Sequence, residues 1–293
     1  MTTAQNGPVA VLGTGIMGSA MAKNLLGAGL ATTVWDRSAT ATESLAQAGA
    51  HVAPTAADAV AEASVVIMML PTAEIVSAVL FDGGVAQALA AGAVVAQMGT
   101  IGVAPTLEIA ARLGRERPDV MFVDAPVSGS KGPAEAGKLL ILASGPTEAE
   151  PAVRPAFTAI GRKTLWLGQA GQGTKLKLVV NAYMSILIEG VAEALELAAQ
   201  FGIDPDEVGE AIAGGPLDAP IADAKLHKME AGDFAPEFPL EWALKDVDLV
   251  LAEAGVKPPL MAALAVQWRS AVDAGHGRED VSAARLALGG PSA

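Results

Sequence analysis

The fold is decided by one stretch near the start of the chain, Val9-Ala10-Val11-Leu12-Gly13-Thr14-Gly15-Ile16-Met17-Gly18. The four apolar residues predict a buried strand, and the sequence from Met17 to Ala28 predicts a helix directly after the glycines. In this setting Gly13 permits a tight turn, Gly15 lets the backbone approach a pyrophosphate, and Gly18 allows close packing of helix on strand. A glycine-rich turn without a ligand is the alternative, but the strand and helix around the glycines favour a dinucleotide site at the helix N-terminus, next to Ile16 and Met17.

Outward from this turn, short apolar runs alternate with Ala- and Leu-rich helical stretches up to about residue 168, which predicts βαβ units on a parallel sheet. The expected strands are Val9–Leu12, Thr32–Trp35, Val65–Leu70, Ala93–Met98, Met121–Val123, Leu139–Ala143 and Thr164–Leu167. After Gly173 the pattern is helical almost throughout, with helices expected at Lys175–Gln200, Pro205–Ala213, Asp218–Met229, Leu240–Ala254 and Leu260–Ala274. The predicted fold class is therefore α/β: a Rossmann-type, doubly wound parallel sheet that binds a dinucleotide in residues 1–168, followed by an all-helical domain in residues 169–293.

Composition narrows the function classes. The 293 residues are 52% hydrophobic and 17% charged, which is typical of packed globular domains. A formal charge of −13 disfavours nucleic acid as a partner. The absence of cysteine excludes disulfides, thiolate metal sites and a cysteine nucleophile, and fits a reducing cytoplasm. The first eight residues lack the basic region of a signal peptide, so we expect a cytoplasmic protein.

Three further features are interpreted as structural. The longest apolar run, Leu178–Ile188, is too short to span a bilayer and predicts a buried core helix, so no membrane association is expected. The histidines, His51, His227 and His276, lie far apart in sequence, so no metal site is expected. At helical spacing, Glu189, Glu193 and Glu196 predict a solvated helix face.

The end of the second expected strand, Trp35-Asp36-Arg37-Ser38, lies where a dinucleotide fold contacts the adenine ribose. Asp36 would accept hydrogen bonds from a ribose 2′-OH and favours NAD. Arg37 and Ser38 could hold a 2′-phosphate and favour NADP. We expect NADP as the cofactor, with NAD possible.

Lys177 and Asn181 are four residues apart and so share a helix face. If that face is buried, desolvation lowers the pKa of the lysine toward the range useful for proton transfer. The alternative is a lysine that extends to water beside a structural asparagine, and Lys175 is a rival for the chemical role.

Four ordered motifs are similar to those of a known family: the glycine turn, Asp124-Ala125-Pro126-Val127-Ser128-Gly129-Ser130, Gly171-Gln172-Gly173-Thr174-Lys175-Leu176-Lys177 through Asn181, and Phe238-Pro239-Leu240 with Lys245-Asp246. The chain resembles the β-hydroxyacid dehydrogenase family (3-hydroxyisobutyrate dehydrogenase-like), and most of all its glyoxylate/succinic semialdehyde reductases. The resemblance implies an NAD(P)-dependent enzyme that interconverts a short-chain aldehyde acid and its hydroxy acid by hydride transfer. It also implies a homodimer or homotetramer, with the helical residues 169–293 as the domain for substrate binding and oligomerisation.

The resemblance selects Lys177 over Lys175 as the proton donor, with Asn181 as its catalytic partner. It assigns the substrate to Ser128, Gly129, Ser130, Thr100 and Phe238, and the cofactor to Leu70, Pro71, Thr100 and Lys245 in addition to the glycine turn. Two positions depart from the family pattern: Asp36 stands where the NADPH-using reductases usually carry Asn, and Gly99 replaces a more usual Ser. An imine reductase and a catalytically silent dinucleotide-binding module are the rival interpretations, and the lysine argues against both.

Overall fold

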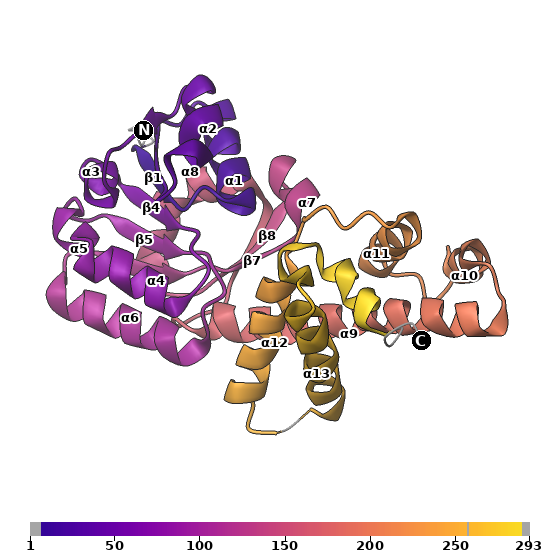
Figure 1. Ribbon diagram of the computed structural model, residues 1–293. Coiled ribbons are helices and arrows are strands. Elements are labelled where there is room, and N and C mark those ends of the chain that lie inside the picture. Colours follow the sequence, from indigo (N-terminus) through magenta and orange to yellow (C-terminus); the bar gives the residue numbers. More distant parts are fainter. Residues whose placement is uncertain (1–6, 257, 289–293) are drawn as a thin grey trace. The chain divides into compact units, whose positions relative to one another are not determined.

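The computed structural model describes residues 7–256 and 258–288, and the chain divides into two compact units between Lys177 and Leu178 (Figure 1). We call these the N-terminal and the C-terminal unit. Their division falls inside one long helix, α9 (Gln172–Phe201), whereas the boundary expected at residues 168 and 169 lies in the loop before that helix.

The N-terminal unit is built on a parallel sheet of the strands β1 (Val9–Leu12), β2 (Thr32–Trp35), β3 (His51–Val52), β4 (Val65–Met68), β5 (Val94–Gln97) and β6 (Met121–Asp124). The strand order is β3-β2-β1-β4-β5-β6. β1, β4 and β5 are buried along their whole length, as the continuous apolar runs predict for strands covered on both faces. The order reverses next to β1, so the loops at the carboxyl ends of β1 and β4 diverge there and leave room for a ligand.

Helices cover both faces of this sheet. The helices of this unit are α1 (Ile16–Gly27), α2 (Glu43–Gln47), α3 (Ala56–Val60), α4 (Ala73–Ser77), α5 (Val85–Ala88), α6 (Val103–Glu116), α7 (Lys131–Glu135) and α8 (Glu150–Ile160), with the short turns η1 (Ala39–Thr42), η2 (Ala78–Asp82) and η3 (Thr147–Ala149). Alternate residues of β1 enter two different cores: Val9 and Val11 pack with α1 and α8, and Ala10 and Leu12 pack with α3 and α6. The predicted doubly wound α/β fold is confirmed.

A second, mixed sheet corrects one expectation. The strands β7 (Val127–Ser128), β8 (Leu139–Ala143) and β9 (Gly161–Trp166) form their own sheet, with β7 antiparallel and β9 parallel to β8. We expected Leu139–Ala143 and Thr164–Leu167 to extend the parallel sheet, and this was wrong. Pro126 has no N–H to continue the ladder from β6, and its carbonyl oxygen instead accepts a hydrogen bond from Leu142 N at 2.9 Å, so the chain turns away into the new sheet.

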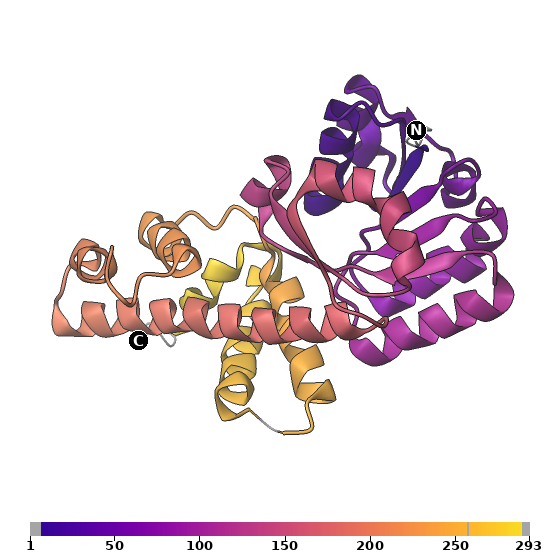
Figure 2. The same cartoon turned by 180° about the vertical axis from the view of Figure 1, so that it is seen from behind.

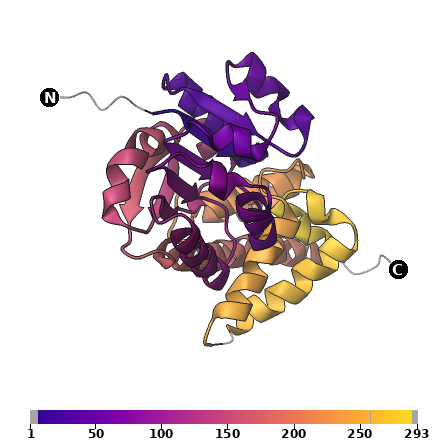
Figure 3. The same ribbon diagram turned by 90° about the vertical axis from the view of Figure 1, so that its left-hand side faces the viewer.

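The C-terminal unit is helical, as predicted. It comprises most of α9 together with α10 (Pro205–Ile212), α11 (Pro220–Ala231), α12 (Leu240–Glu253), α13 (Pro259–Asp273), η4 (His276–Arg278) and η5 (Val281–Ala287). α12 and α13 lie side by side (Figure 3) and share a core in which Trp268 and Leu240 are fully buried.

Helix α9 is seen along its length in Figure 2. One face, with Ile188, Ala192 and Leu195, is buried in the core of the C-terminal unit. Another stripe leaves apolar side chains in solvent: Val179, Tyr183, Leu197 and Phe201 are 67%, 64%, 51% and 75% exposed. By length and composition alone α9 could cross a membrane, but 44% of its most apolar window is buried inside the protein. The expectation of a buried core helix therefore holds for one face only.

Glu189 corrects the expectation of a solvated acidic stripe. Its side chain is 7% exposed, and Oε2 accepts a hydrogen bond of 2.7 Å from Trp268 Nε1. Burial raises the pKa of this carboxyl. Glu193, one helical turn later, is exposed as expected. The acidic stripe is therefore solvated at Glu193 but buried at Glu189.

Candidate active site

The glycine turn after β1 has the geometry that a pyrophosphate requires. Gly13 has a φ of +93°, and a Cβ there would lie 2.5 Å from Met69 O, so only glycine fits. A Cβ on Gly18 would overlap the carbonyl oxygen of Gly13. Gly15 is exposed with open space around its Cα, and α1 begins at the next residue. The turn thus offers backbone N–H groups at a helix N-terminus to an anion, with Ile16 and Met17 half-buried beside it.

Asp36 at the end of β2 braces this turn. Its Oδ2 accepts hydrogen bonds from Thr14 N at 2.7 Å and Thr14 Oγ1 at 3.2 Å, and its Oδ1 accepts one from Ser38 N at 2.9 Å. Arg37 and Ser38 are exposed. Both carboxylate oxygens are therefore partly engaged within the protein, while the side chains that suit a 2′-phosphate face solvent.

Leu70 and Pro71 follow β4, and Thr100 follows β5, at the same edge of the sheet as the glycine turn. The backbone around Gly99 leaves no room for a side chain in this chain. A Cβ on Gly99 would overlap the carbonyl oxygen of Leu70, and backbone cannot yield as a flexible side chain can. Gln97 Nε2 holds this contact in place by donating to Gly99 O at 2.7 Å. The backbone of Leu70 therefore packs directly against the backbone at position 99.

The proposed carboxylate-binding turn follows β7. Ser128 is its last strand residue, Gly129 has a φ of +133°, and α7 begins after Ser130. In the part of the chain that the structure describes, neither the Ser128 nor the Ser130 hydroxyl makes a hydrogen bond to the protein. Ser128 and Ser130 are half-buried and Gly129 is exposed.

The two lysines of α9 differ in environment. Lys175 is exposed, Lys177 is partly buried, and Asn181 is 3% exposed. Lys177 and Asn181 lie on one face of α9, and Lys175 is rotated roughly 200° from Lys177. Of this pair, the asparagine is buried and the lysine only partly so.

Asn181 is held by a residue to which we assigned no role from sequence. Its Nδ2 donates to Asp246 Oδ2 at 2.6 Å, and Asp246 Oδ1 lies 2.9 Å from Lys245 Nζ. The oxygen Oδ1 of Asn181 is buried and accepts no hydrogen bond from the described residues. Since the amide nitrogen is committed to Asp246, this oxygen remains as an acceptor for a donor supplied by a neighbouring group or a substrate.

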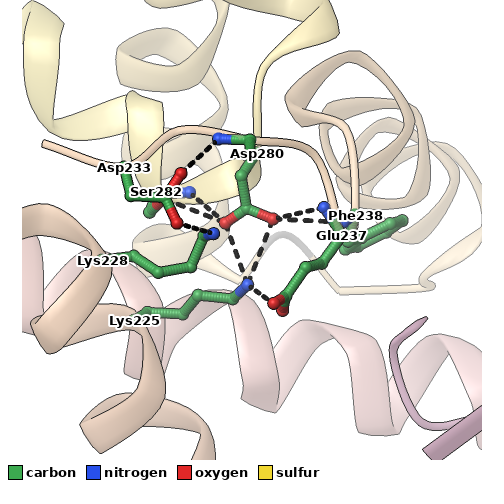
Figure 4. A network of polar contacts seen from close by, with 8 residues as sticks. Lys225, Lys228, Asp233, Glu237, Phe238, Asp280 and Ser282 are labelled. Atoms are coloured by element: carbon green, nitrogen blue, oxygen red, sulfur yellow. Dashed lines mark hydrogen bonds and ion pairs between the residues drawn. The ribbon is translucent and has the colours of Figure 1, made fainter. Parts of the chain in front are cut away.

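Phe238 precedes α12 in a segment fixed by the buried Asp280 (Figure 4). Asp280 Oδ2 accepts hydrogen bonds from the backbone N of Glu237 and of Phe238, each at 3.1 Å, and Val281 N donates to Phe238 O at 2.8 Å. Lys225, 2% exposed, donates to both carboxylate oxygens of Asp280 at 2.9 and 3.1 Å. This buried pair was not predicted, because Lys225 has the sequence surroundings of a surface lysine.

Two of the three histidines have local partners. His227 Nδ1 lies 2.8 Å from Asp223 O, and His276 Nδ1 lies 2.9 Å from Glu279 Oε2. Within residues 7–256 and 258–288, no group of three or more His, Asp or Glu side chains is arranged to hold a metal ion.

Two protein families match consecutive parts of the chain. Residues 8–168 match the NAD binding domain of 6-phosphogluconate dehydrogenase, and residues 171–287 match the NAD-binding region of NADP-dependent 3-hydroxyisobutyrate dehydrogenase.

Individual proteins match over nearly the whole length. Glyoxylate/succinic semialdehyde reductase 1 of Arabidopsis thaliana is 35% identical over 283 residues, which cover 94% of this chain and 96% of that protein. The crystal structure of 3-hydroxyisobutyrate dehydrogenase from Salmonella typhimurium has a TM-score of 0.89 at 29% identity and covers 96% of this chain and 99% of its own. An imine reductase from Myxococcus stipitatus, with a TM-score of 0.64 at 23% identity over 97% of this chain and 100% of its own, shares the fold alone.

Proposed function

We propose that this chain, which belongs to the β-hydroxyacid dehydrogenase family of NAD(P)-dependent oxidoreductases, reduces a short aldehyde that carries a carboxylate to its hydroxy acid, using Lys177 as proton donor. Glyoxylate and succinic semialdehyde are the substrates to test first, with 3-hydroxyisobutyrate for the reverse direction. The observation that carries the proposal is the helix face shared by Lys177 and Asn181, on which the buried asparagine keeps one oxygen as an unused acceptor.

The residues divide the chemistry between them. When bound, the nicotinamide supplies the hydride to the carbonyl carbon. Lys177 donates a proton to the carbonyl oxygen, and its positive charge stabilises the negative charge that develops there. Asn181 orients the lysine or the oxygen. Ser128, Gly129 and Ser130 bind the carboxylate, while Thr100 and Phe238 contact the substrate and Lys245 the cofactor.

The carboxylate-binding role of Ser128 has a direct test. Ser128→Ala removes a hydroxyl that the protein leaves unbonded, so the KM for glyoxylate should rise about 10- to 100-fold with kcat nearly unchanged, as expected for one hydrogen bond to a charged group. An aldehyde without a carboxylate serves as the matched control in steady-state assays. Equal effects of Ser128→Ala on both aldehydes would contradict the assignment.

The cofactor preference is tested separately. We expect kcat/KM to be modestly higher with NADPH than with NADH, since Arg37 and Ser38 are exposed while Asp36 is engaged by Thr14 and Ser38. Asp36→Asn keeps one acceptor oxygen and removes the negative charge, so it should raise the preference for NADPH by about 2- to 10-fold. A strong preference for NADH that relaxes in Asp36→Asn would show that Asp36 dominates.

The apolar stripe on α9 supports a homodimer or homotetramer. Val179, Tyr183, Leu197 and Phe201 recur along a helix face and are at least half exposed, and exposed apolar side chains on one face are typical of a subunit interface. Light scattering of the purified protein measures the mass of the oligomer and so distinguishes a dimer or tetramer from a monomer.

A cytoplasmic location is part of the same proposal and is supported by the absence of cysteine.

A further inference from the structure

Asp124, the last residue of β6, carries a carboxylate that is completely buried and surrounded by neutral donors. Its Oδ1 accepts a hydrogen bond of 2.7 Å from Thr174 Oγ1. Its Oδ2 accepts hydrogen bonds from Thr174 N at 2.9 Å, Gly171 N at 3.1 Å and Ser144 Oγ at 3.0 Å. Gly171 and Thr174 belong to the loop and first turn that start α9, so one carboxylate collects the N–H groups of that helix start.

The choice of an ionisable group here needs a reason, because burial acts against it. Burial raises the pKa of Asp124, and the hydrogen bonds from Thr174, Ser144 and Gly171 only partly oppose that effect. A carboxylate is nonetheless suited to the N-terminus of a helix, where its charge meets the positive end of the helix dipole and each N–H donates a charge-assisted hydrogen bond. Such bonds are short and directional, so they hold the helix start in a more defined position than apolar packing alone would.

A second set of contacts removes the remaining freedom of this turn. Asp124 and Ser144 pair through their backbones, with Ser144 N donating to Asp124 O at 2.7 Å and Asp124 N donating to Ser144 O at 2.9 Å. Ser144 Oγ in turn accepts from Gly173 N at 2.9 Å. A Cβ on Gly173 would overlap Leu142 O, which shows that the helix start lies directly against β8. These contacts join the first turn of the helix to both β6 and β8.

Lys177 lies three residues after Thr174, less than one turn along the same helix. The position of its Cα and the direction of its side chain follow from where the first turn is fixed. That turn is fixed to the carboxyl end of β6, at the same edge of the sheet as the loops after β1, β4 and β5. A displacement of about 1 Å in a reacting group can cost about 10²-fold in rate.

We propose that Asp124 is a positioning residue for the proton donor. By binding Gly171 and Thr174 it fixes the position and orientation of the first turn of α9, and thereby places Lys177 for proton transfer to the reacting oxygen. This rests on the proposed function, since it takes Lys177 as the proton donor. Thr174 is the matching group on the helix, because its N–H and its hydroxyl each bind one carboxylate oxygen.

The test uses the full-length enzyme and a matched pair of variants. Thr174→Val keeps the side-chain shape but removes the hydroxyl that binds Asp124 Oδ1, whereas Thr174→Ser restores it. We expect Thr174→Val to lower kcat by about 10- to 100-fold while cofactor binding, followed by fluorescence, is unchanged, and Thr174→Ser to stay within about threefold of the parent. The primary deuterium isotope effect on kcat is measured with reduced cofactor deuterated at the transferred position. It should rise in Thr174→Val, because a misplaced proton donor slows the chemical step. A smaller folded fraction alone would leave it unchanged.

A double-mutant cycle with Lys177→Met separates positioning from plain stability. If Thr174 acts through the lysine, Thr174→Val should cause no further loss of kcat in the Lys177→Met background. If the kcat loss of the double variant equals the product of the two single losses, the positioning role is wrong. It is also wrong if Thr174→Val keeps full kcat while Lys177→Met is inactive. Full kcat in Lys177→Met itself would overturn the proposed function as well. Should Thr174→Val not fold, Ser144→Ala, which also removes a donor to Asp124, takes its place in the same cycle.

Discussion

A Lys177→Met enzyme is expected to lose about two to four orders of magnitude in kcat while it still binds the reduced cofactor. Methionine keeps the length and the apolar stem of the side chain but cannot donate a proton. Hydride transfer without acid assistance should then remain as a slow residual reaction. The loss should appear in kcat rather than in the KM for the cofactor, because the glycine turn and Asp36 are untouched.

Lys175→Met is the matched control. Lys175 lies two residues earlier on the same helix, is exposed, and is rotated roughly 200° from Lys177, so its replacement should cost little. Steady-state kinetics with glyoxylate, together with fluorescence titration of the cofactor, compare the two variants. Loss of kcat in Lys175→Met with cofactor binding intact, or its retention in Lys177→Met, would contradict both the helix register and the mechanism.

Asp280→Ala is expected to lower the free energy of unfolding by about 3–5 kcal/mol, because it leaves the buried ammonium of Lys225 without its main partner. Glu237 Oε2 lies 3.2 Å from Lys225 Nζ, but the Glu237 side chain is 39% exposed and compensates only in part. The substitution also leaves the backbone N–H groups of Glu237 and Phe238 without an acceptor. Urea unfolding measures the loss. The control is Arg269→Gln, which breaks the half-exposed pair with Asp248 and should cost at most about 1 kcal/mol.

The same pair predicts a pH dependence. Burial acts to raise the pKa of Asp280, but the hydrogen bonds and charge of Lys225, together with the N–H groups of Phe238 and Glu237, outweigh it, and the pKa is lowered. An acid whose pKa is lowered by folding stabilises the folded state above the pKa of the unfolded chain, about 4. The contribution is lost as the pH falls from there through the folded pKa. Asp280→Asn should therefore show a weaker fall of stability in acid than the parent, and identical slopes would contradict this.

The limits of individual strands could be predicted from the sequence better than the strands with which each one pairs. Val9–Leu12, Thr32–Trp35 and Leu139–Ala143 are strands with the expected limits, since apolar runs bounded by turn residues are local signals. Which sheet Leu139–Ala143 joins depends on Pro126 and on the pairing of Asp124 with Ser144, contacts that the local pattern does not contain. The strand His51–Val52 is too short and too exposed to give any pattern.

The candidate site shows the same division. Spacing was enough to put Lys177 and Asn181 on one helix face and to put the glycine turn at the end of a strand. It could not show that Asp246, 65 residues beyond Asn181, holds the amide, or that Asp124 binds Thr174 from 50 residues away. Lys225 and Glu189 look like surface residues in sequence, and only the packed structure reveals that each is buried.

Because Lys177 and Asn181 stand on opposite sides of the division between the two compact units, yet within four residues of one continuous helix, the units are not interchangeable modules at that division. Chimeras between relatives that cross over between Lys177 and Leu178 would take the two halves of the proposed catalytic pair from different parents. A crossover at our proposed domain boundary, residues 168 and 169, would move α9 as a whole. It would then separate Asp124 from Thr174 instead, so recombinants made there should work best between parents that share both of these residues.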